Sequence, residues 1–393
     1  MKRYVYADNA ATTSVSPEVI AEMMPCFESD WGNPSSLHSK GREAKVILDN
    51  ARARVARCLG AEPSEIYFTS CGTEADNWAI RGAAMRMKKK GRCHIVTSAI
   101  EHHAVLHTCQ ALEKEGFEIT YVGVDEFGTV NLDELREAVT DKTALVAIMY
   151  ANNEIGTIEP IREICDIAHA KGALMFTDAV QAVGNVEINL KELPVDMLSL
   201  SGHKIHAPKG IGALYIRRGV VIDNLIEGGA QERRKRGGTE NLPYIVGLAK
   251  ALEVATENIP TLASVREKRD RLIEELTKIP YSKLNGHRTN RLPGIVNIGF
   301  EFIEGESLLL WLDIAGICAS TGSACSSESL EPSHVLIATG VPHEKAHGSL
   351  RISISRETTD EDIDYIIENV PLVVEKLRNM SPLWEDVVKA GKK

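Results

Sequence analysis

Short apolar segments alternate with helical patterns between about residues 60 and 220. Several of the apolar segments carry almost no polar side chain, as is typical of buried parallel strands. The predicted strands are residues 66–69, 94–98, 119–124, 144–150, 174–177, 197–200 and 212–216. The predicted helices between them are residues 73–90, 102–115, 131–139 and 160–171, the last with Pro160 in its first turn. This alternation predicts an α/β fold with a mostly parallel sheet covered by helices on both faces.

The pattern changes from residue 241 onward. One long helical stretch reaches about residue 278, and it is followed by predicted strands at 295–300 and 350–353 and predicted helices at 305–315 and 359–378. These elements indicate a second, smaller α+β domain. We therefore expect a large domain of residues 13–255 and a small domain formed by residues 1–12 and 256–393.

The composition narrows the classes of partner. Lysine and arginine total 45 against 55 acidic residues, and the net charge of -10 argues against nucleic acid as the main ligand. No run approaches the ~18 consecutive apolar residues of a membrane span, and no signal-peptide apolar region follows Met1, so we expect a cytoplasmic protein. The eight cysteines are scattered without a CxxC pair, which favours reduced thiols over disulfides or structural zinc.

Two strand ends carry side chains suited to one cofactor chemistry. Lys204 follows the strand at 197–200, and Asp178 follows the strand at 174–177, where open α/β sheets place their ligands. A lysine amine can hold the aldehyde of pyridoxal phosphate as a Schiff base, while a carboxylate keeps the pyridine nitrogen protonated. The ordinary alternatives are a surface lysine and a helix N-cap.

A phosphate site is predicted where the strand at 66–69 meets the next helix. Gly72 permits close approach of the backbone, and the helix that begins at Thr73 offers free N–H groups and a hydroxyl. Ser201 and His203 could reach the same phosphate. The alternatives are a plain helix cap for Thr73 and a satisfied loop hydroxyl for Ser201.

An ordered series of motifs covers nearly the whole chain, from residue 5 to about 385. The motifs are Asp8-Asn9-Ala10-Ala11-Thr12-Thr13, Gly32-Asn33-Pro34-Ser35-Ser36, Glu101-His102, Asn152-Asn153-Glu154-Ile155-Gly156, Asp178-Ala179-Val180-Gln181, Ser201-Gly202-His203-Lys204 and Gly322-Ser323-Ala324-Cys325. Together they resemble the NifS/IscS cysteine desulfurases. Three further stretches are more similar to the NifS branch, namely Gln231-Glu232-Arg233, Gly238-Thr239-Glu240-Asn241 and Leu330-Glu331-Pro332-Ser333-His334-Val335.

The resemblance implies the fold-type-I architecture of pyridoxal-phosphate transferases and a role for individual residues. Lys204 would hold the cofactor aldehyde, Asp178 would face the pyridine nitrogen, Gln181 the phenolic oxygen, and His102 would lie over the ring as a catalytic group. The implied cofactor-binding set is Gly72, Thr73, His102, Asn153, Asp178, Gln181, Ser201, Gly202, His203, Lys204 and, from the other subunit of a homodimer, Thr239. The implied substrate-carboxylate set is Asn33, Asn153 and Arg351.

Cys325 distinguishes the implied reaction from amino-group transfer. It lies in a run of small and polar residues within about 319–333, which predicts an exposed, mobile loop and a poor site for a structural thiol. The resemblance implies that this thiol takes sulfur from L-cysteine, leaving L-alanine and a persulfide for iron–sulfur cluster assembly. The acceptor would be a scaffold of NifU or IscU type, with Cys325 as a transient cluster ligand and no intrinsic metal site.

Other interpretations remain open at this point. A selenocysteine lyase or an aminotransferase of the same fold would use the same lysine and aspartate, and a non-catalytic sulfur carrier would need no cofactor. His103 and His107 have the i, i+4 spacing of metal ligands, but without a third ligand they indicate a solvated helix face. The basic run at 233–236 is expected in a loop near the cofactor phosphate, and Cys71 is expected to serve in packing.

Overall fold

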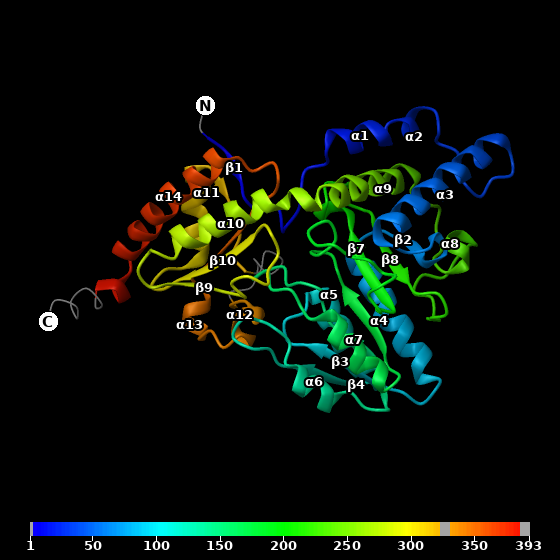
Figure 1. Ribbon diagram of the computed structural model, residues 1–393, viewed down its shortest axis with the longest axis horizontal. Coiled ribbons are helices and arrows are strands. Elements are labelled where there is room, and N and C mark those ends of the chain that lie inside the picture. The colour runs from blue at the N-terminus through cyan, green and yellow to red at the C-terminus, as the bar shows by residue number, and fades with distance from the viewer. Residues whose placement is uncertain (1–2, 323–330, 386–393) are drawn as a thin grey trace.

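The computed structural model describes residues 3–322 and 331–385, which form two main sheets with their helices and a further sheet of two strands (Figure 1). The larger sheet has seven strands in the order β2-β8-β7-β6-β5-β3-β4. Neighbouring strands are parallel except at β8, which runs antiparallel to both β2 and β7. The strands are β2 (Ile66–Thr69), β3 (His94–Ser98), β4 (Glu118–Val122), β5 (Thr143–Ala147), β6 (Leu174–Asp178), β7 (Met197–Ser201) and β8 (Gly212–Ile216). The predicted α/β fold is confirmed.

Helices cover both faces of this sheet because each presents an apolar stripe to it. One core cluster joins a face of the sheet to α3, α7 and α9, and another joins the opposite face to α4 and α5 around Trp78 and Phe176. These helices, with the short α6 near β4, are α3 (Ser39–Leu59), α4 (Gly72–Lys88), α5 (His103–Lys114), α6 (Leu132–Ala138), α7 (Ile161–Ala170) and α9 (Leu242–Glu257). Pro160 is the N-cap of α7 and does not lie in its first turn, which corrects one predicted helix start.

Three helices before residue 60 were not predicted from the sequence pattern. They are α1 (Pro17–Met23), α2 (Pro25–Glu28) and the long α3. The buried face of α3 includes Ala44, Leu48, Ala51, Val55 and Leu59, so its apolar positions recur every three or four residues. Exposed Val46 and buried Arg52 depart from this pattern, and they obscure a periodicity that indicates a helix.

The smaller sheet is antiparallel, with strand order β12-β10-β9, and it packs against α10, α11 and α14. Its elements are β9 (Ser282–Leu284), β10 (Ile295–Phe300), β12 (Ser349–Ser353), α10 (Ala263–Leu276), α11 (Gly305–Ala315) and α14 (Asp360–Asn379). The single helix expected over 241–278 is wrong. It is divided into α9, a 3-10 turn (Ile259–Leu262) and α10, because Pro260 lacks the amide that a continuing helix needs.

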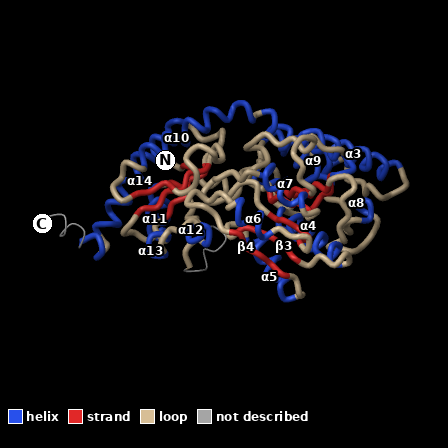
Figure 2. The backbone as a smooth tube through the Cα atoms, turned by 60° about the horizontal axis from the view of Figure 1, so that its bottom comes forward, coloured by secondary structure: helices blue, strands red, loops and turns tan. Residues whose placement is uncertain are grey.

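The N-terminal segment packs with the unit built around the smaller sheet, although most of that unit lies at the other end of the sequence. β1 (Val5–Tyr6) pairs in parallel with β11 (Ile317–Cys318), and Val5 and Ala7 belong to the same core cluster as α10 and α14. Figure 2 shows the strands of the two units as separate groups. The domain boundary at residue 256 stays a prediction. Within the described ranges, no helix combines the length and the apolar character that crossing a membrane requires.

Candidate active site

A cavity of about 420 Å³ lies at the carboxyl ends of β6 and β7 and at the start of α4. Its size falls in the range of sites that hold small molecules. Most of the predicted site residues line it together, namely Gly72, Thr73, His102, Asn153, Asp178, Gln181, Ser201, His203, Lys204 and Arg351. The structure thus joins residues from both ends of the sequence in one cavity.

The remaining predicted residues lie elsewhere. Gly202 is buried, and a Cβ there would come within 3.0 Å of Ala207 and 2.9 Å of Ile211, so this glycine allows tight packing beneath Lys204. Asn33 and Thr239 are exposed and do not line the cavity. Cys325 lies outside the described residues.

Lys204 ends the short 3-10 turn (Gly202–Lys204) that follows β7. Its Nζ donates hydrogen bonds to the carbonyl oxygens of Ala10 at 2.6 Å and Ala11 at 2.9 Å. The amide of Gln181 donates to the same Ala10 oxygen at 2.9 Å. The N-terminal segment therefore positions the amine inside the cavity.

Two buried carboxyl groups, those of Asp76 and Asp178, line the cavity. Burial raises the pKa of Asp178 to about 6, while the Val180 amide and Lys204 oppose the increase. Burial raises the pKa of Asp76 well above its ordinary value, and the charge of Asp178 adds to the effect. The Ser199 hydroxyl donates to Asp76 at 2.5 Å. Asp178 is therefore the carboxylate that carries the charge at neutral pH, and a cation beside it would offset the unfavourable burial.

The start of α4 forms the predicted phosphate cradle, with one correction. The N-cap is Cys71, whose sulfur accepts from the Glu74 amide at 3.4 Å, so Thr73 lies within the first turn. Cys71 is half-buried and lines the cavity, so it serves in more than packing. A Cβ at Gly72 would come within 2.8 Å of Val180, which shows how closely the backbone approaches here.

His102 is uncharged at neutral pH. Burial lowers its pKa to about 4, and the charge of Lys204 contributes. Its Nδ1 accepts a hydrogen bond from the Ala104 amide at 3.2 Å, which leaves the ring proton on Nε2. His103 packs between His107 and His334, with ring centroids 4.9 Å apart in each pair. No group of metal-ligating side chains suited to a metal ion occurs among the described residues.

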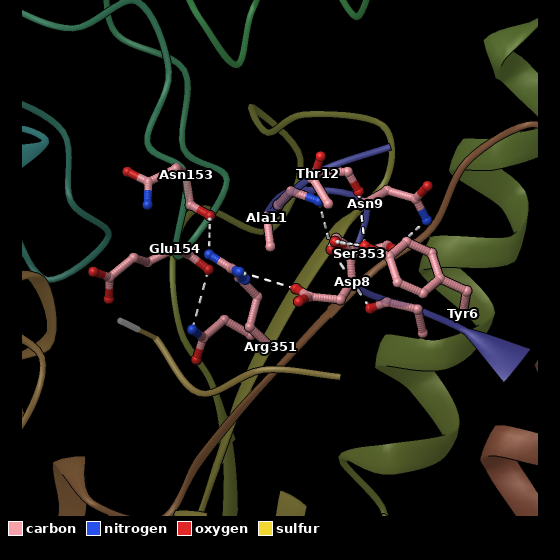
Figure 3. Close-up of polar contacts among 12 residues, drawn as sticks. Tyr6, Asp8, Asn9, Ala11, Thr12, Asn153, Glu154, Arg351 and Ser353 are labelled. Atoms are coloured by element: carbon pink, nitrogen blue, oxygen red, sulfur yellow. Dashed lines mark hydrogen bonds and ion pairs between the residues drawn. The ribbon is translucent and has the colours of Figure 1, made fainter. Parts of the chain in front are cut away.

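Arg351 on β12 reaches the cavity from the smaller sheet. Its Nη1 donates to the carbonyl oxygen of Asn153 at 3.1 Å, and its Nη2 pairs with Asp8 Oδ1 at 3.0 Å (Figure 3). Neighbouring Glu154 is buried and accepts a hydrogen bond from Ser333, and Gly322 also lies against Glu154. The side chains of Asp8, Asp76 and His334 belong to the site although the sequence analysis gave them no role.

The basic run at 233–236 contributes one contact to the cradle. Arg236 pairs with Glu74 at 2.8 Å, and Glu74 in turn accepts from the Ser70 amide at 2.8 Å. Glu232, Arg233 and Arg234 all have positive φ, which is strained for side chains of this size. A buried bidentate pair between Arg52 and Glu232 holds this turn in place.

The residues present fit pyridoxal phosphate. The cavity has an amine at Lys204, an ionised carboxylate at Asp178 whose burial favours a protonated ring nitrogen, and N–H groups at the start of a 17-residue helix for a phosphate. The hydroxyls of Thr73 and Ser201 line the same cavity. These groups match the aldehyde, the ring nitrogen and the phosphate of that cofactor.

Comparison with known proteins gives matches over nearly the full chain. The family model described as aminotransferase class-V matches residues 5–366. The chain is 59% identical over 380 residues to the cysteine desulfurase IscS of Methanosarcina thermophila, covering 96% of this chain and 94% of that protein. It is 54% identical over 395 residues to the cysteine desulfurase IscS of Clostridium botulinum, covering 99% of each. A solved NifS-like protein superimposes with a TM-score of 0.90 at 40% identity, covering 95% of this chain and 100% of that chain.

Proposed function

The chain belongs to the class-V aminotransferase family and is a cysteine desulfurase, and we propose that Cys325 takes up the sulfur as a persulfide while L-cysteine becomes L-alanine. One observation carries the assignment of the reacting centre. Lys204, Asp178 and Arg351 come from three separate elements and line one cavity. An amine, a carboxylate and a guanidinium so placed suit the aldehyde, the ring and the α-carboxylate of an amino acid bound to pyridoxal phosphate.

Family membership implies pyridoxal phosphate as the cofactor. We propose that Lys204 holds its aldehyde, Asp178 its ring nitrogen and Gln181 its phenolic oxygen. The phosphate would be held by the start of α4 with Thr73, Ser201 and His203. When bound, this cofactor withdraws electrons from the α-carbon of an amino acid and so makes its neighbouring bonds labile.

The protein's own groups would then position the substrate and move its protons. Arg351 would bind the α-carboxylate, with Asn153 beside it, and Asn33 is the third residue proposed for this role. The Lys204 amine would take the proton from Cα and return it during formation of alanine. His102 is a neutral imidazole at physiological pH because its pKa is lowered to about 4. It can therefore accept a proton from a substrate without first releasing one to solvent.

We propose a homodimer as the active form. Apolar side chains gather on α1, α2 and the loop after them, where Ile20, Met24, Phe27, Trp31 and Leu37 are all exposed. A second copy of the chain is the occupant that would cover this surface, since isologous pairing is the commonest protein assembly. Thr239 is exposed and lies outside its own cavity, which suits a contact with the cofactor phosphate of the other subunit.

The sulfur would leave the enzyme for iron–sulfur cluster assembly. We propose a scaffold protein of NifU or IscU type as the acceptor of the Cys325 persulfide, with Cys325 as a transient cluster ligand. Transfer from one thiol to another requires only that the acceptor be a thiolate with access to the outer sulfur.

The proposed reaction is tested by incubating the protein with sulfur-labelled L-cysteine and no keto acid. We expect alanine and protein-bound sulfane sulfur in equal amounts in the first turnover. A requirement for a keto acid would favour an aminotransferase, and a much higher rate with L-selenocysteine would favour a lyase specific for that substrate. A protein without visible cofactor absorbance would instead fit a sulfur carrier.

Asp178→Asn is expected to slow alanine formation by at least about a hundredfold, because the amide cannot keep the ring nitrogen protonated. The amide preserves the shape of the side chain, so cofactor is expected to remain bound in part. Alanine release per mole of bound cofactor measures the effect separately from occupancy. Turnover within a few-fold of wild type would show that this carboxylate is not the ring partner.

A further inference from the structure

The N-terminal segment places a carboxylate against the only guanidinium that lines the described part of the active-site cavity. Residues 7–10 run alongside β12, where the Asn9 and Ala10 amides donate to the Ser353 carbonyl and hydroxyl at 3.1 and 2.9 Å. The Ser353 amide donates back to Ala7 at 2.7 Å. These contacts fix Asp8 beside Arg351, two positions before Ser353 on the same strand (Figure 3).

The same segment also contacts Lys204. Ala10 and Ala11, two and three residues after Asp8, supply the carbonyl oxygens that accept from its Nζ. Tyr6 donates its hydroxyl to the Thr12 carbonyl at 2.8 Å, which ties the turn together. Asp8 is thus held by backbone contacts on both sides and does not owe its place to Arg351 alone.

Arg351 has donors left over in this arrangement. Its side chain is 2% exposed, and of its five N–H groups one donates to Asn153 and one to Asp8. Its Nε is buried without a hydrogen-bond partner among the described residues. Burying an N–H group without a hydrogen-bond acceptor costs free energy. The Arg351 guanidinium is therefore arranged to donate hydrogen bonds to a further anion.

That further anion would meet a negative charge already in place. Asp8 is the single carboxylate that forms an ion pair with Arg351 among the described residues, and the pair is largely removed from water. Two carboxylates on one buried guanidinium repel each other strongly, because the surrounding protein screens charge less than water does. Burial also raises the pKa of Asp8 above its ordinary value despite the opposing charges of Arg351 and Lys204.

We propose that Asp8 is a specificity-determining residue that competes with the substrate carboxylate for Arg351 and so weakens the binding of carboxylate ligands. This inference rests on the proposed role of Arg351. Its consequence is a site that releases carboxylate-bearing product readily. Replacing the Asp8 carboxylate by an uncharged group that keeps an oxygen in the same position should therefore tighten the binding of carboxylate ligands. If Asp8 had only a structural role, the same replacement should weaken that binding.

The test measures binding of two thiols to the holoenzyme by calorimetry at pH 8. The first is 3-mercaptopropionate, which is L-cysteine without its amino group, and the second is 3-mercaptopropionamide, which also lacks the carboxylate charge. We expect Asp8→Asn to bind the carboxylate about tenfold more tightly than wild type and to bind the amide equally well. Asp8→Ala should also bind the carboxylate more tightly than wild type. If Asp8→Asn does not fold, Asp8→Ala provides the same test.

Two controls isolate the charge. Asp8→Glu keeps a carboxylate and should gain no affinity, and Asp362→Asn removes the partner of Arg3 on the surface and should change nothing. Unchanged or weaker carboxylate binding in both Asp8→Asn and Asp8→Ala would overturn the inference. Arg351→Gln tests the role of Arg351 separately from the role of Asp8. If this variant binds 3-mercaptopropionate as tightly as wild type does, Arg351 is not the carboxylate-binding residue.

Discussion

Replacing Lys204 by alanine is expected to abolish desulfurase activity to the limit of detection. Lys204 is the one lysine that lines the described cavity, and its Nζ is fixed by the Ala10 and Ala11 carbonyls. Without this amine there is neither an attachment for the cofactor aldehyde nor a base at the substrate α-carbon. The visible absorbance after dialysis measures the loss of cofactor attachment, and alanine formation from L-cysteine measures the loss of catalysis.

A nearby lysine provides the matched control for this experiment. Lys209 is exposed and lies five residues further along the chain, and Lys209→Ala should keep both activity and absorbance. Borohydride reduction followed by peptide mapping locates the attached cofactor in each protein. Labelled cofactor recovered on a different lysine of the Lys204→Ala protein would show that the assignment is wrong.

Replacing Cys325 by serine or alanine is expected to stop persulfide formation while leaving cysteine binding intact. Binding requires the groups around Lys204 and Arg351, and the described contacts of both involve other residues. A hydroxyl or a methyl group cannot accept sulfane sulfur, so alanine release should fall by at least about a thousandfold. The change in visible absorbance on adding L-cysteine should persist.

Two other thiols make the Cys325 experiment decisive. Cys71 lines the cavity at the start of α4, and Cys318 lies on β11, the strand that pairs with β1. Cys71→Ala and Cys318→Ala should keep sulfur transfer within a few-fold of wild type. Sulfane sulfur that still accumulates at the wild-type rate in Cys325→Ser would show that the nucleophile is a different cysteine, with Cys71 and Cys318 the first to examine.

The sequence predicted those site residues whose position follows from the strand or helix next to them in the chain. Asp178 and Lys204 each end or follow an apolar strand, and parallel strands bring their carboxyl ends to one edge, so their proximity follows from the pattern alone. The start of α4 was predicted within one residue for the same reason. The alternative of a helix cap at Thr73 is wrong, because the N-cap is Cys71, a residue type that is not among the preferred N-caps.

The parts that could not be predicted depend on contacts between distant segments. Asp8 and Arg351 are separated by 343 residues, and nothing in the spacing of either indicates that they form a pair. Asp76 lies on the apolar face of α4, where a carboxyl group is an exception to the hydrophobic pattern that defines the helix. Its contact with Ser199 depends on the packing of α4 over β7.

The attachment of residues 7–10 to β12 has a consequence for how the enzyme is made. This segment is synthesised before its partners on β11 and β12, which lie more than three hundred residues later in the chain. Closing so long a loop is slow compared with forming local contacts. The seven-stranded sheet can therefore assemble before the N-terminal segment pairs with β11 and β12. Lys204 is therefore synthesised well before the Ala10 and Ala11 carbonyls that hold it can be fixed against β12. We expect the active site to form only after β12 has been synthesised.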